Sequence, residues 1–78
     1  MPGIIEDMPF EARMERIKEI AVALAELVRR FANITVADAL KKAAEQLRVA
    51  ISQVKYGLNY ALSRNMFRLS DDETLIPA

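Results

Sequence analysis

Apolar side chains near the start of the chain recur at alternating steps of four and three residues. The residues that follow this spacing are Phe10, Met14, Ile17, Ala21, Leu24, Val28 and Phe31. Because an α-helix has about 3.6 residues per turn, the pattern predicts a helix of roughly six turns. Asp7 or Met8 can cap this helix, and Pro9 suits its first turn.

A second apolar row, formed by Ile20, Leu27 and Ile34, widens the stripe beyond a simple coiled-coil seam. A stripe of this width can cover the core of its own chain, contact a second copy of the chain, or do both. The residues expected to take part in a homodimer are Phe10, Met14, Ile17, Ile20, Leu24, Leu27 and Val28.

Two shorter helices are expected after this long one. Residues 33–35 include two β-branched side chains and predict a very short strand or an extended connection. Thr35 is suited to cap the second helix, with Asp38 at the acidic position of a capping box. The apolar positions of the second helix are Val36, Ala39, Leu40, Ala43, Ala44 and Leu47.

The third helix is expected from about Ala50 to Arg64, and Asn65 can end it with left-handed backbone. Its inward positions are Val54, Leu58, Ala61 and Leu62. Two strands, 66–69 and 74–76, then flank an acidic turn. A hairpin this short cannot stand alone, so it is expected to lie against the helices. The side chains that it is expected to bury are Phe67, Leu69, Leu75 and Ile76.

Residues 43–58, AAEQLRVAISQVKYGL, resemble the helix-turn-helix family. The positions that carry the resemblance are Ala44 at the helix crossing, Leu47 at the end of the second helix, Val49 in the turn, and Val54 and Leu58 in the third helix. Together with the short strand and the hairpin, they give the element order of a winged helix. The resemblance implies a mainly α fold with a small β-hairpin, in which the third helix presents its outer face to DNA. Residues 9–78 would form one winged helix-turn-helix domain, preceded by an N-terminal arm of residues 1–8.

The turn departs from the family pattern, because Arg48 stands where glycine is usual. Left-handed backbone at Arg48 would cost about 1 kcal/mol. Ala50 stands at the usual capping position, and Ser52 could cap instead, which would start the helix two residues later.

Gly57 lies inside the third helix, where glycine costs about 1 kcal/mol relative to alanine. Close approach of another backbone, either the second helix or a phosphate strand, would explain this glycine.

The side chains expected on the outer face or flank of the third helix are Ile51, Ser52, Gln53, Lys55, Tyr56 and Asn59. Amide side chains can pair with adenine, lysine can reach guanine or phosphate, and tyrosine can donate to phosphate. Further candidates for phosphate contact are Lys41, Lys42, Arg48, Arg64 and Arg68.

Charge is segregated along the chain although the formal net charge is zero. Residues 1–28 hold six acids and three bases, residues 29–68 hold eight bases and two acids, and residues 71–73 are all acidic. The basic segment coincides with the segment that resembles a DNA reader, as phosphate contact requires. The acidic turn would be repelled by phosphates, so only Arg68 at its base is expected to touch DNA.

The 78 residues include no cysteine and no histidine, which removes the thiolate nucleophile, the commonest zinc ligand and the commonest general base. No glycine-rich phosphate loop or nucleophile elbow is present. We therefore expect that the protein is not an enzyme and that it binds neither a cofactor nor a metal ion. No apolar run reaches the roughly 18 to 20 residues of a membrane span, and the start lacks a secretory pattern, so an intracellular, cytoplasmic protein is expected.

These observations predict a sequence-specific duplex-DNA-binding protein, either a small transcriptional regulator or an accessory factor, which acts as a homodimer. The main alternative is a winged helix that binds proteins through the acidic turn and the first helix. A purely structural dimer is a third possibility.

Overall fold

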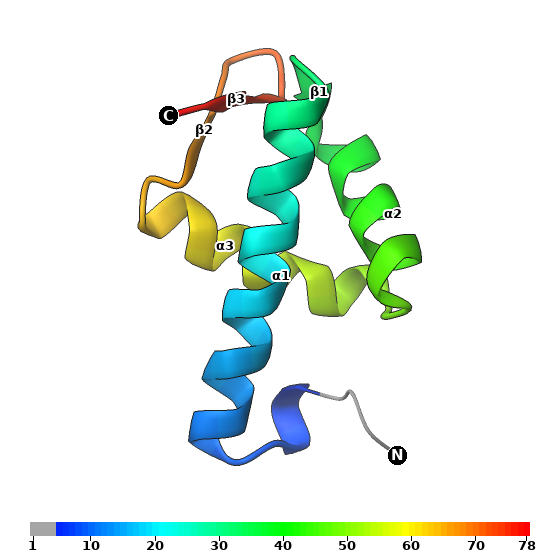
Figure 1. The fold of residues 1–78 in the computed structure, drawn as a ribbon, viewed down its shortest axis with the longest axis vertical. Helices are drawn as coiled ribbons and strands as arrows, with labels where there is room; N and C mark the ends of the chain where they lie inside the picture. The colour runs from blue at the N-terminus through cyan, green and yellow to red at the C-terminus, as the bar shows by residue number, and fades with distance from the viewer. Residues whose placement is uncertain (1–4) are drawn as a thin grey trace.

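The computed structural model describes residues 5–78 and shows three helices with a small sheet (Figure 1). The elements, in chain order, are a 3₁₀ turn η1 (Ile5–Asp7), α1 (Phe10–Arg30), β1 (Ile34–Thr35), α2 (Val36–Leu47), α3 (Ile51–Ser63), β2 (Phe67–Leu69) and β3 (Thr74–Pro77). The fold is thus mainly helical with an antiparallel sheet, as the sequence predicted. None of the helices within residues 5–78 is long and apolar enough to cross a membrane.

Helix α1 runs along the long axis of the molecule, and α3 crosses it (Figure 1). The core lies where α1 meets the other elements, and the largest fully buried side chains come from α1 and four of these elements. These side chains are Phe67, Ile5, Ile20, Leu24, Leu75, Val28 and Val54. No polar or charged side chain is buried within the described range, so apolar packing alone fills this core.

The apolar stripe of α1 faces the core of its own chain. Five of the seven residues expected at a dimer contact are buried there, namely Ile17, Ile20, Leu24, Leu27 and Val28. Their role in a homodimer stays a prediction, but within their own chain they are covered where α1 packs against α3, α2 and β3. Met14 is half-buried, whereas Phe10 is 67% exposed. The other large exposed apolar residue within α1 is Val22.

The three strands pair in the order β1–β3–β2, all antiparallel. Ile34 of β1 lies opposite Leu75 of β3, so the hairpin is joined to the short strand that precedes α2. Phe67 and Leu75 are buried as expected, and Ile76 is half-buried. Leu69 is exposed, contrary to expectation, and Phe67 is the one buried residue of β2.

The expected cap of α2 is confirmed, since the Asp38 backbone N–H donates to Thr35 Oγ1 at 3.1 Å. Helix α2 ends at Leu47, and its C-cap, Arg48, has left-handed backbone with φ 58° and ψ 46°. Three residues later α3 has begun, with Ala50 as its N-cap and no side-chain cap bond. The alternative start at Ser52 is therefore wrong. Asn65, after α3, also has left-handed backbone, as expected.

Gly57 lies where α3 crosses α1. A Cβ atom on Gly57 would lie 2.6 Å from Ile20 Cβ and 3.1 Å from the backbone nitrogen of Ala21. Carbon atoms in contact are normally about 3.5–4.0 Å apart, so only glycine fits there. The expected close approach is found, but its partner is α1, and neither α2 nor a phosphate strand is needed to explain the glycine.

Part of the predicted N-terminal arm is packed on the domain. Ile5 is fully buried and belongs to the core, and the Met8 backbone N–H donates to the Ile5 carbonyl at 3.1 Å. The packed unit therefore includes η1 and begins earlier than residue 9. Residues 1–4 of the arm lie outside the described residues.

Candidate nucleic-acid interface

The outer face of α3 is open to solvent. Val54, Gly57, Leu58 and Ala61 are its buried positions, at the spacing of one helical face. The opposite face exposes Ser52, Lys55, Tyr56 and Asn59, and Ile51 is exposed on its flank. Of the six residues predicted for this surface, Gln53 differs because it is half-buried.

Exposed cations lie at the two ends of α3 and on α2. Arg48 lies in the turn before α3, Arg64 at the C-cap of α3, and Lys41 on α2. Between residues 5 and 78 the single ion pair joins Arg16 to Glu19 at 3.0 Å, and it involves none of these cations. Within residues 5–78 none of these three cations forms an ion pair with a carboxylate, although Arg64 lines a pocket together with Glu11 and Glu15.

Two of the predicted phosphate contacts lie over aromatic rings. The Lys42 ammonium is 5.0 Å from the centroid of the Phe31 ring, which the Arg30 guanidinium approaches to 5.7 Å. Phe31 follows α1 directly, so Lys42 is directed towards the C-terminal end of α1. Lys41 is one residue earlier on α2 and therefore points about 100° away. Arg64 lies over the Tyr60 ring at 5.2 Å.

The N-terminal turn η1 touches the same face, which the sequence analysis missed. The Tyr56 hydroxyl donates to Glu6 Oε2 at 2.5 Å, and Gln53 Nε2 donates to Glu6 Oε1 at 3.4 Å. The Ile5 backbone N–H donates to Gln53 Oε1 at 2.8 Å. The one available sequence signal was an apolar residue, Ile5, inside a predicted arm. Nothing in local spacing links residues that lie fifty positions apart.

The Glu6–Tyr56 hydrogen bond shifts the pKa of both groups. It is the main cause that lowers the pKa of Glu6 below its ordinary value of 4.5, and the backbone N–H of Glu6 acts in the same direction. The same bond raises the pKa of Tyr56 above its ordinary value of 10.0, because the phenol must keep its proton to donate. At neutral pH a carboxylate charge is therefore held beside α3.

The hairpin turn presents carboxylates. Asp71, Asp72 and Glu73 are exposed, and Asp72 accepts hydrogen bonds from the hydroxyls of Ser70 and Thr74. The bond from Ser70 is the largest cause that lowers the pKa of Asp72, and the bond from Thr74 acts in the same direction. Arg68, near the base of the turn, is exposed as well. Across residues 5–78 no group of three or more acidic side chains is arranged to hold a metal ion.

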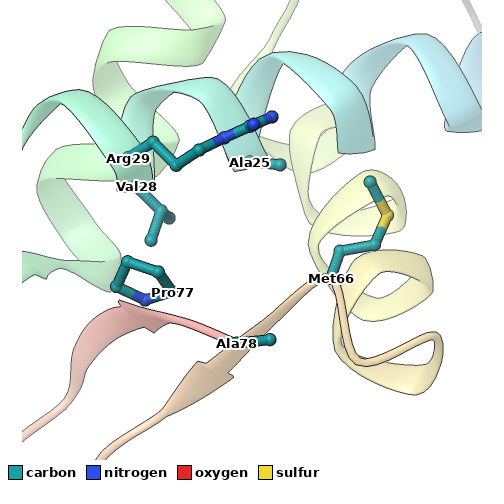
Figure 2. Close-up of a pocket in the computed structure, with 6 residues that line it drawn as sticks. All are labelled: Ala25, Val28, Arg29, Met66, Pro77 and Ala78. Atoms are coloured by element: carbon teal, nitrogen blue, oxygen red, sulfur yellow. The ribbon is translucent and has the colours of Figure 1, made fainter.

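A pocket of about 340 Å³ lies elsewhere, between α1, the start of β2 and the C-terminal end of the chain. Figure 2 shows its six lining residues, Ala25, Val28, Arg29, Met66, Pro77 and Ala78. Arg29 is the one charged residue among the six. None of the residues predicted to contact DNA lines this pocket. The candidate site is therefore the exposed face of α3 with Arg48 and Arg64 at its ends.

Comparison of the chain with protein-family models, with curated proteins and with solved structures gave no match.

Proposed function

We propose that this chain is a winged helix-turn-helix protein that binds duplex DNA, with α3 as the recognition helix. The element order and the β1–β3–β2 sheet support the winged-helix assignment, and so does the break of three residues between α2 and α3. The observation that carries the proposal is the exposed outer face of α3 with Arg48 and Arg64 at its two ends, neither of them in an ion pair within residues 5–78. A small transcriptional regulator or an accessory DNA-binding factor would use such a face.

In the proposed complex, the outer face of α3 enters the major groove. The groove is about 12 Å wide and admits one helix with its side chains. Asn59 supplies the amide that can pair with an adenine edge, and Lys55 reaches guanine or phosphate. Arg48, Lys41 and Arg64 flank the helix and contact phosphates, which fixes its register on the duplex.

The hairpin has a different role in this proposal. Its turn carries three exposed carboxylates, which phosphates repel, so it does not grip the minor groove. Its contribution is to hold β1 and the start of α2, where the Val36 backbone N–H donates to the Glu73 carbonyl at 3.0 Å. Arg68 is the hairpin residue that can reach a phosphate.

We also propose a homodimer, with two half-sites about 34 Å apart. Since most of the α1 stripe is buried within the chain, a dimer contact through α1 has to use its exposed apolar residues, Phe10 and Val22. Light scattering on the wild type and on Phe10→Ser with Val22→Ser measures this. A wild type that is monomeric at micromolar concentration would contradict the proposed dimer. The proposal that the chain binds DNA would still stand.

DNA binding is tested by fluorescence anisotropy with a labelled pool of random duplexes at several salt concentrations. With about four phosphate contacts, affinity should fall on the order of 100-fold between about 50 and about 200 mM salt. Lys55→Glu should weaken binding about tenfold or more. The matched control is Lys18→Glu, which makes the same charge change on the exposed surface of α1. Binding that ignores salt, or equal effects of the two variants, contradicts the proposal.

The acidic turn favours a second candidate function, a winged helix that binds a basic protein surface. Under this alternative Asp71→Asn with Asp72→Asn should abolish capture of the partner, whereas Lys55→Glu should not. A purified chain that shifts no duplex at low salt but forms a complex sensitive to the turn would favour this function over DNA binding.

A further inference from the structure

The polar side chains on one edge of α3 are already occupied by groups from the same chain. Glu6 accepts hydrogen bonds from Tyr56 and Gln53, and the Ile5 backbone N–H donates to Gln53. A phenol and a carboxamide are also groups that bond to phosphate oxygens and base edges in a complex with DNA. The Glu6 carboxylate therefore stands where a phosphate oxygen would accept the same bonds.

The position of Glu6 is set by its neighbour. Ile5 is fully buried in the core and fixes the backbone of η1 one residue before Glu6. The Glu6 side chain itself is exposed, so the core does not need a carboxylate at this position. A charge of this sign beside α3 opposes the approach of phosphates within the screening length of about 8 Å at physiological salt.

We propose that η1 is an autoinhibitory segment that competes with DNA for the edge of α3 formed by Gln53 and Tyr56. This inference rests on the DNA-binding function proposed above. In the closed state, Glu6 holds both side chains. In the DNA-bound state, phosphate takes the place of Glu6, and η1 leaves this edge of α3. The apparent affinity for DNA is thereby reduced by the fraction of molecules that are closed.

The sharpest variant is Glu6→Gln, which removes the charge and keeps the size of the side chain. Its matched control is Asp7→Asn, because Asp7 lies in the same turn, is exposed and undergoes the same change in charge. Any general gain in DNA affinity that comes from a less acidic N-terminal segment should appear in both variants. The difference between them measures the contact of Glu6 with Tyr56 and Gln53.

The assay is anisotropy titration of the full chain with the labelled pool of random duplexes, at the same salt concentrations for all variants. We expect Glu6→Gln to bind at least about fivefold more tightly than Asp7→Asn, the lower end of typical coupling between competing states. The slope of log affinity against log salt should become steeper by about one phosphate contact. Far-UV circular dichroism verifies that both variants are folded.

Two failures are distinguishable. If the wild type and both variants bind duplex equally well, the autoinhibitory role is overturned and DNA binding stands. If none of the three binds at low salt, the proposed function fails and this inference fails with it.

A second measurement is hydrogen exchange at the Ile5 amide, which donates to Gln53 in the free chain. Saturating duplex should speed this exchange, and an amide that stays equally protected in the complex contradicts displacement of η1.

Discussion

Replacing Gly57 by alanine tests the closest contact in the fold, the crossing of α1 and α3. An added Cβ would lie 2.6 Å from Ile20 Cβ, and Ile20 is fully buried. The two helices would have to separate by about 1 Å to restore an ordinary carbon contact. The nearby backbone nitrogen of Ala21, at 3.1 Å, cannot rotate away as a flexible side chain could.

Two opposing effects set the magnitude. Alanine gains about 1 kcal/mol over glycine from helix propensity. Overpacking a buried contact costs about 1–3 kcal/mol, and a rigid contact this short belongs at the upper end of that range. We therefore expect Gly57→Ala to lower the free energy of unfolding by about 2 kcal/mol. For a domain of this size, that corresponds to a fall in Tm of about 8–16 °C.

The assay is thermal and urea unfolding followed by far-UV circular dichroism. Asn59→Ala is the matched control, since it places alanine on the exposed face of the same helix. It should raise stability by about 0.5 kcal/mol through helix propensity alone. If Gly57→Ala is as stable as the wild type or more stable, α1 and α3 do not approach closely at Gly57, and the presentation of α3 described above is wrong.

Two further predictions concern the turn before α3 and the contact of η1. Arg48→Gly should raise the free energy of unfolding by about 0.5–1 kcal/mol, because glycine adopts left-handed backbone without strain; a loss of stability in urea unfolding would contradict this. The Glu6–Tyr56 bond should add to the free energy of unfolding above pH 4.5, and this contribution should be lost as the pH falls through the lowered pKa of Glu6. It should also be lost at high pH, when Tyr56 ionises above its ordinary pKa of 10.0. An NMR titration should therefore find a higher pKa for Glu6 in Tyr56→Phe than in the wild type, and equal values would show that the bond is not formed in solution.

Local interactions explain what could be predicted. The bounds of α2 and α3 follow from the spacing of apolar residues, from the Thr35 cap and from the left-handed turn at Arg48, each of which involves residues within a few positions of one another. The hairpin strands were predicted for the same reason. The exposed outer face of α3 follows once its buried face is known, because the helical period fixes the opposite side.

The helices, the break at Arg48, the hairpin and the segregation of charge can all be read from the order of residues along the chain. The residue pattern also shows that one face of α1 is apolar, but the packing of the folded chain was needed to show that this face is covered by the same chain. The partner of Gly57, the exposure of Leu69 and the contact of Glu6 with Tyr56 were also decided by the tertiary structure. The physical reason is that periodicity records which side of an element avoids water, whereas the group that covers that side comes from residues far away in the chain.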